Sequence, residues 1–180
     1  MLEYCLIATT FGPVGLAWSD RGLCRLQLPE VTGPSVVPRL LRGIEAREGD
    51  PPDWLAPAMV RLQAYFTGVK TDLSATPLDF DGVPDFHRAL YLEMLALGWG
   101  ETTTYGQLAA RAGAPGAAQA VGQAMGKNPL PIIVPCHRVL ANGNKLGGFS
   151  APGGPGTKAR LLAMEGVSIG AVSGQLAFAF

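Results

Sequence analysis

Apolar and polar positions alternate in short stretches near the start of the chain. Three such stretches occupy residues 4–9, 14–19 and 22–28. Gly-Pro and Asp-Arg-Gly turns separate them, as is typical of short β-strands joined by tight turns. In the third stretch Cys24, Leu26 and Leu28 share one face, so we expect Cys24 to face a core and to have a structural role.

Further along the chain, apolar residues recur every three or four positions, which predicts amphipathic helices. The expected helices span residues 38–47, 53–66, 86–97, 105–112, 116–126 and 158–165. Residues 68–85 hold several Asp, Pro and Gly and resemble a linker. We therefore predict an α+β fold, with a small sheet-plus-helix domain over residues 1–84 and a mainly helical domain over 85–180. Weak alternation at Leu176, Phe178 and Phe180 predicts a final strand or ordered tail.

Two of these helices have the outline of a helix-turn-helix. Thr104 and Gln107 form a capping-box pattern at the start of the first helix. A Gly-Ala-Pro turn at 113–115 joins it to the second helix. The second helix carries small side chains at Ala117, Ala118, Ala120, Gly122 and Ala124. Such a helix either packs tightly in a core or lies close to a backbone or in a narrow groove.

The stretch from Asn128 to Arg138 carries the candidate chemistry. Residues 132–134 form a β-branched run between two prolines, which predicts a short buried strand. Cys136, His137 and Arg138 follow directly. A buried structural cysteine beside two incidental polar residues is one interpretation. Three polar groups directly after an apolar run favour a functional site.

Composition and charge restrict the function less than these motifs do. Residues 1–85 carry 7 basic and 11 acidic side chains, and residues 86–180 carry 7 and 3, so the second half is basic. A basic half can bind a polyanion although the whole chain is neutral. The chain has neither a signal peptide pattern nor an apolar run long enough for a membrane span. Three scattered cysteines favour a reducing compartment, so we expect a cytoplasmic protein without a metal or a cofactor.

A thiol at this position needs a base or a cation, because burial raises its pKa. His87 reads as a surface or half-buried residue of its helix, so His137 is the better candidate base. The two neighbours Cys136 and His137 can meet only through a turn or a bridging water. Glu165 is the only carboxylate after Glu101 and the only nearby acid in sequence that could orient His137. A thiol hydrolase stays an alternative, although no oxyanion hole is evident in the sequence.

Pro135-Cys136-His137-Arg138-Val139 resembles the active-site signature of the 6-O-alkylguanine-DNA alkyltransferases. The resemblance runs from about Phe86 through residues 104–109, the Ala-rich helix, Asn128-Pro129 and residues 161–166. It is looser in the first half, where that family has a variable ribonuclease-H-like domain. Together these motifs cover most of residues 86–166.

The resemblance implies a role for each site residue. Cys136 takes the alkyl group from the 6-oxygen of guanine in a single irreversible turnover, and the 4-oxygen of thymine is a second candidate source. His137 receives the thiol proton through water, Glu165 orients His137, Asn128 supports the site, and Tyr105 donates to the departing guanine. The implied partner is double-stranded DNA with a flipped-out base, bound by a monomer. The implied DNA and lesion contacts are Ala117, Ala118, Gln119, Gly122, Met125, Arg138, Val139 and Ser150.

Two departures from the family pattern bear on this prediction. Gln119 stands where the family usually has an arginine that fills the gap left by the flipped base. The glycine-rich loop carries what look like two extra residues, Ala151-Pro152. The main alternative function is a module that recognises alkylguanine without removing the alkyl group. Such relatives lack the cysteine, whereas this chain has Cys136.

Overall fold

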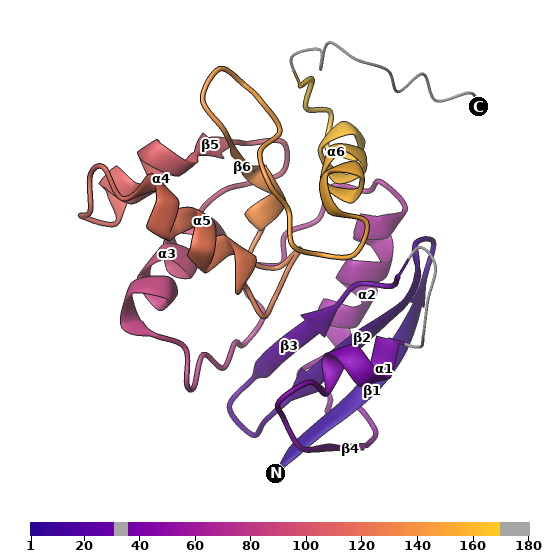
Figure 1. Ribbon diagram of the computed structural model, residues 1–180. Helices are drawn as coiled ribbons and strands as arrows, with labels where there is room; N and C mark the ends of the chain where they lie inside the picture. The colour runs from indigo at the N-terminus through magenta and orange to yellow at the C-terminus, as the bar shows by residue number, and fades with distance from the viewer. Residues whose placement is uncertain (31–35, 170–180) are drawn as a thin grey trace.

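The structure is a computed structural model of the chain, and it describes residues 1–30 and 36–169. The first half forms a small sheet with helices, and the second half is mainly helical (Figure 1). The α+β fold predicted from the pattern is therefore confirmed. The strand expected at 176–180 lies outside the described residues. No helix in the described ranges is long and apolar enough to cross a membrane.

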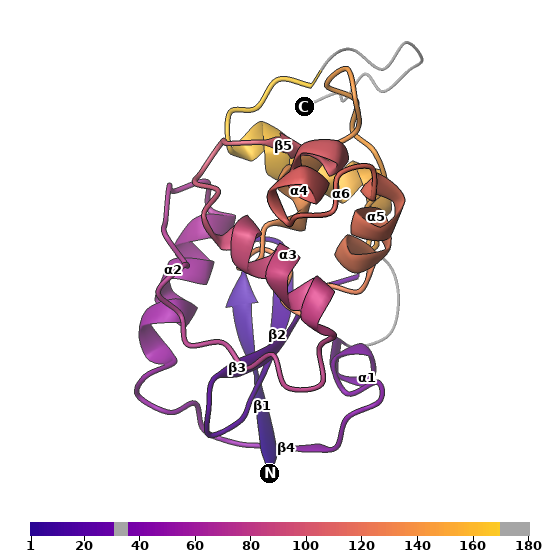
Figure 2. The same cartoon turned by 90° about the vertical axis from the view of Figure 1, so that its left-hand side faces the viewer.

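The sheet has four strands in the order β3-β2-β1-β4. β1 (Leu2–Thr9), β2 (Gly12–Trp18) and β3 (Leu23–Gln27) form an antiparallel meander, close to the three predicted strands. α1 (Val36–Leu40) and α2 (Ala56–Phe66) lie on opposite faces of this sheet (Figures 1 and 2). α1 approaches closely because β2 has a glycine beneath it: a Cβ on Gly15 would lie 2.9 Å from Val36 Cγ1.

Two details of the first half differ from the prediction. The helix expected at 38–47 ends at Leu40, and the chain then turns into β4 (Ala46–Glu48), which pairs in parallel with β1. Cys24 is only partly buried, whereas Leu23 and Leu26 are fully covered. The cause is a register shift in the β2–β3 pairing at Ala17/Trp18, which breaks the strict alternation.

The segment predicted as a linker has little regular structure, but it is fixed to the sheet. Leu23 N donates to Pro77 O, and Asp79 N donates to Leu23 O, both at 2.9 Å. The Asp79 carboxylate also accepts from Ser19 at 2.6 Å and forms an ion pair with Arg21. The segment therefore connects the two halves without swinging free of the sheet.

The second half begins with α3 (Asp85–Leu95) and continues into α4 (Tyr105–Arg111) and α5 (Ala118–Gly126), which pack against each other. The predicted capping box is present: Gln107 N donates to Thr104 Oγ1, and Thr104 N donates to Gln107 Oε1. His87 is half-buried on α3, as expected. α6 (Gly154–Met164) starts four residues before the predicted helix.

The prediction of a strand at residues 132–134 is wrong. These residues form a tight turn, closed by an isolated bridge between Pro131 and Val134. Ile132 has φ 75°, which is unusual for a β-branched residue. A 3-10 turn, η1 (Cys136–Arg138), follows, and the short strand β6 (Val139–Leu140) then pairs in parallel with β5 (Thr103–Thr104).

One hydrophobic core spans both halves of the molecule. Ile7 and Leu16 of the sheet, Leu62 of α2 and Leu90 of α3 belong to the same buried cluster as Cys136. α2 covers one face of the sheet, and Tyr65 in its last turn meets the ring of His137 in η1, with centroids 6.4 Å apart (Figures 1 and 2). The site is thus built on a continuous packed core.

Candidate active site

Asn128 holds the turn that precedes the cysteine. Its Nδ2 donates to Val134 O at 2.8 Å, and its Oδ1 accepts from Leu130 N at 3.0 Å. These bonds close the loop around the left-handed Ile132 and end it at Val134. The turn therefore fixes the position of Cys136, which has only 6% of its surface exposed.

His137 is the middle residue of η1 and is fully buried. Its Nε2 is 2.8 Å from Glu165 Oε1, at the end of α6. Arg138 also bonds this carboxylate, from Nε to Oε2 at 2.8 Å and from Nη2 to Oε1 at 2.9 Å. The structure therefore brings together three of the predicted residues in one buried ion network.

Besides the bonds from Arg138, two further contacts of Glu165 were not expected from the sequence. The hydroxyl of Tyr65, in the last turn of α2, donates to Oε1 at 2.7 Å. The amide of Gly100 donates to Oε2 at 3.1 Å. Burial acts to raise the pKa of the Glu165 carboxyl, but the bonds from His137 and Arg138 outweigh it and hold that pKa well below its usual range. The carboxylate is therefore charged near neutral pH.

The hydrogen bonds indicate which ring nitrogen of His137 carries the proton. Nε2 faces a carboxylate, so it must donate, and neutral His137 then has its lone pair on Nδ1. Nδ1 is buried and has no hydrogen-bond partner in the described part of the chain. Burial lowers the pKa of His137, while Glu165 acts to raise it. The ring is thus a neutral base with its accepting atom unused.

Burial raises the pKa of the Cys136 thiol, and a hydrogen bond from Asn128 and the charge of Lys158 oppose the rise. Lys158 is another residue that the sequence did not single out. It is fully buried on α6, and its Nζ donates to Val139 O at 2.6 Å and to Gly148 O at 3.1 Å. Burial lowers its pKa to about 8. Lys158 thereby ties the backbone after Cys136 to the glycine-rich loop.

An open cleft of about 660 Å³ reaches Cys136 from the side of α4 and α5. Seven predicted site residues line it: Tyr105, Ala118, Gln119, Gly122, Met125, Cys136 and Ser150. The hydroxyl of Tyr105 is 3.3 Å from Gly148 O, which places it over the glycine-rich loop. Burial raises the pKa of Tyr105, so it stays a hydrogen-bond donor.

The remaining predicted DNA or lesion contacts lie elsewhere. Ala117 precedes α5 and is half-buried, and Val139 is fully buried. Neither lines the cleft. Arg138 is 6% exposed, and its guanidinium is engaged by Glu165 and by Leu97 O. Its placement supports a role in orienting Glu165 and gives no support to a contact with the lesion.

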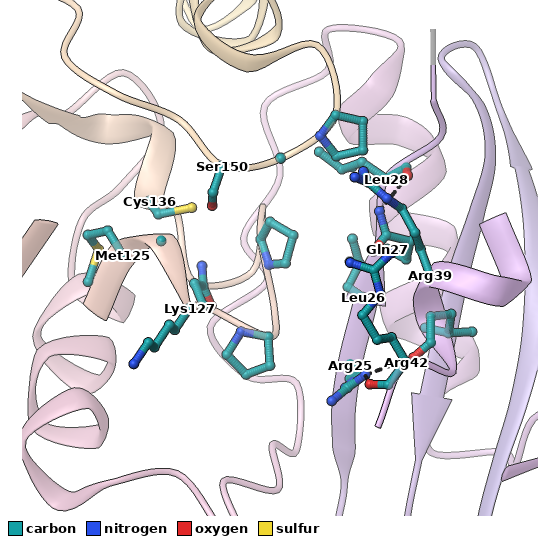
Figure 3. Close-up of a pocket in the computed structure, with 17 residues that line it drawn as sticks. Arg25, Leu26, Gln27, Leu28, Arg39, Arg42, Met125, Lys127, Cys136 and Ser150 are labelled. Atoms are coloured by element: carbon teal, nitrogen blue, oxygen red, sulfur yellow. Dashed lines mark hydrogen bonds between the residues drawn. The ribbon is translucent and has the colours of Figure 1, made fainter. Parts of the chain in front are cut away.

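A second cleft, of about 340 Å³, meets Cys136 from the side of the sheet. In Figure 3 Cys136 and Ser150 form one wall, and Leu26, Gln27 and Arg39 lie on the opposite wall. The two residues that look inserted, Ala151 and Pro152, line this cleft. The described residues contain no group of three His, Cys, Asp or Glu side chains that could hold a metal ion.

Comparison with known proteins agrees with this geometry. Residues 85–167 match the model of the 6-O-methylguanine DNA methyltransferase DNA-binding domain, and residues 2–80 match that of the same family's ribonuclease-like domain. The chain belongs to the 6-O-methylguanine DNA methyltransferase family. The resemblance inferred from the Pro-Cys-His-Arg-Val motif is thus confirmed.

Individual methyltransferases of this family are similar over nearly the whole chain. The methylated-DNA–protein-cysteine methyltransferase of Mycolicibacterium paratuberculosis is 37% identical, covering 92% of this chain and 93% of its own. The mouse protein of the same name is 33% identical and is covered to 83%. The crystal structure of Mycobacterium tuberculosis OGT in complex with DNA superposes with a TM-score of 0.73 at 37% identity, covering 91% of this chain and 92% of its own.

Proposed function

We propose that this protein repairs alkylated guanine in DNA by transferring the alkyl group irreversibly to Cys136. The observation that carries the proposal is the position of Cys136 at the meeting point of two clefts, directly beside a buried His137–Glu165 pair. Similarity to methyltransferases along nearly the whole chain supports it. We further propose that the protein acts as a monomer in the cytoplasm, on double-stranded DNA.

The transfer step follows from the arrangement around Cys136. Its sulfur attacks the alkyl carbon in line with the bond to the 6-oxygen of guanine, so an S–C bond forms and a C–O bond breaks. The thiol proton passes through a water molecule to His137 Nδ1, the unused acceptor. Glu165 stabilises the resulting imidazolium through Nε2. No base in the site can cleave a thioether, so each molecule acts once.

The leaving group is the guanine, which departs with the electron pair of the C–O bond and regains one proton. The Tyr105 hydroxyl donates a hydrogen bond to this developing anion. The cleft of about 660 Å³ is large enough for a flipped base, because small-molecule sites span roughly 300–1,000 Å³. Ala118 and Gly122 present a nearly bare face of α5, which suits close approach to the minor groove.

The lesion-binding module without transfer is not favoured, because the acceptor thiol and its base are both in place. The two activities differ in one experiment with an oligonucleotide that contains 6-O-methylguanine. We expect Cys136→Ala to lose all alkyl transfer while it still binds this duplex more tightly than an undamaged one. Cys5→Ala and Cys24→Ala, at the other two free thiols, should transfer normally. Continued transfer by Cys136→Ala would exclude Cys136 as the acceptor.

A further inference from the structure

Tyr65 lies in the first half of the chain, 72 residues before His137, yet it reaches the centre of the proposed acceptor site. Its hydroxyl donates to Glu165 Oε1 at 2.7 Å and is 3.2 Å from His137 Nε2. The residue is 1% exposed. Its ring meets those of Phe66 and Trp99 edge-on, each with centroids 5.4 Å apart. The hydroxyl is therefore held in place by packing on both sides.

Glu165 Oε1 receives three donors within 2.7–2.9 Å: Tyr65, His137 and Arg138. An oxygen shared in this way offers less negative charge to each donor. The strength with which Glu165 holds the proton on His137 thus depends on Tyr65. Too tight a hold would leave His137 protonated and unable to accept the thiol proton.

The groups that face His137 come from three elements. Tyr65 belongs to α2, Glu165 and Lys158 to α6 and its end, and Cys136 and Arg138 flank His137 within η1. Arg138 and Lys158 are cations that also serve the backbone, through Leu97 O and through Val139 O and Gly148 O. Tyr65 is uncharged, and within the described residues its hydroxyl has hydrogen-bond contacts only with Glu165 and His137.

We propose that Tyr65 is a positioning residue, which fixes the Glu165 carboxylate and limits how tightly His137 keeps its proton. Through this one hydroxyl the N-terminal sheet-and-helix half takes part in the acceptor chemistry. The inference rests on the proposed function, because it assigns Tyr65 to the proton acceptor of that same reaction.

The test is the pH profile of single-turnover methyl transfer at saturating oligonucleotide. The rate falls at acid pH as His137 becomes protonated. Tyr65→Phe removes one donor from the carboxylate, so His137 binds its proton more tightly and the acid limb moves to higher pH. We expect a shift of about one to two pH units, which corresponds to the loss of one hydrogen bond to a charged group. An unmoved limb, or one moved to lower pH, would overturn the proposal.

Tyr91→Phe is the matched control. Tyr91 is equally buried, and its hydroxyl donates to Ala124 O at 2.7 Å, whereas that of Tyr65 contacts Glu165 and His137. Both variants lose one buried hydrogen bond, so both lose stability, but only Tyr65→Phe should move the limb. If Tyr65→Phe is too unstable to assay, a ring-fluorinated tyrosine at position 65 replaces it. Its more acidic hydroxyl donates more strongly and should move the limb to lower pH; no movement would count against the proposal.

The same data separate failure of the inference from failure of the proposed function. If the wild-type protein transfers no methyl group at any pH, the proposed function fails. If the wild-type protein transfers but Tyr65→Phe has the wild-type profile, only the positioning role of Tyr65 fails. Nitrogen NMR of labelled histidine gives a direct check, since the chain has only His87 and His137. Tyr65→Phe should raise the titration midpoint of His137 alone.

Discussion

Glu165→Gln is the most informative single change for the stability of the site. Glu165 and Arg138 form a buried ion pair, with side-chain exposures of 0% and 8%. The substitution keeps the shape but leaves the guanidinium without its counter-charge. Removing one partner of a buried pair costs about 3–5 kcal/mol, and we expect the lower end because glutamine keeps one acceptor oxygen and Arg138 keeps Leu97 O. With a urea dependence of about 2 kcal/mol/M, the midpoint falls by about 1.5 M.

The assay is urea unfolding of the two proteins over a range of pH. The pKa of Glu165 is lowered in the folded state, so its charge stabilises the fold above the ordinary carboxyl pKa of about 4.3. That stability is lost as the pH falls from there through the lowered value. The difference between wild type and Glu165→Gln should therefore be largest near neutral pH and shrink in acid.

The control for this prediction is Glu101→Gln. The Glu101 carboxylate accepts from Gly98 N at 2.7 Å, but it is exposed and has no ion pair in the described structure. Its substitution should cost at most about 1 kcal/mol. The double variant Glu165→Gln/Arg138→Met should lose less than the sum of its single changes, by about 1–3 kcal/mol. Equal losses in Glu165→Gln and Glu101→Gln would refute the reasoning.

Two further substitutions test the approach to Cys136 and to DNA. Asn128→Ala removes both bonds of the turn before Cys136, so it should cost about 2 kcal/mol in thermal or urea unfolding and slow the transfer; Gln63→Ala, which loses one exposed bond to Ala8 O, should do neither. Gln119→Arg adds a cation on the exposed face of α5, so the salt slope of duplex binding should steepen by about 0.9. It should also raise the transfer rate from duplex relative to single-stranded DNA, whereas Gln123→Arg, one turn further on, should change only the salt slope. An unchanged rate ratio in Gln119→Arg would show that glutamine already fills the gap.

The sequence predicted well what depends on neighbouring residues. The capping box at Thr104 and Gln107 formed as expected, because both groups lie within one helical turn. The strand expected at 132–134 failed because Asn128 binds the backbone on both sides and closes a turn that β-branched propensity alone disfavours. The two hydrogen bonds of the Asn128 side chain thus outweigh the local β-strand propensity of residues 132–134.

Two parts of the site left no signal in the sequence. Tyr65 lies 100 residues from Glu165, and in its own helix it occupies an ordinary core position. Lys158 looks like a solvated residue at a helix start, but α6 begins earlier and turns it inward under Gly148. Tyr65 reaches the site through the packing of the two halves, and Lys158 through the packing of α6 against the backbone at Val139 and Gly148. No local spacing in the sequence encodes either arrangement.

The central claim is single, irreversible transfer to Cys136, and mass spectrometry tests it most directly. The protein is incubated with excess oligonucleotide containing 6-O-methylguanine, and the masses of the intact chain and of its proteolytic peptides are measured. The account predicts a gain of one methylene per molecule, confined to the peptide that carries Cys136, with no second turnover. A methylene on another residue, or continued demethylation by molecules already modified, would contradict it.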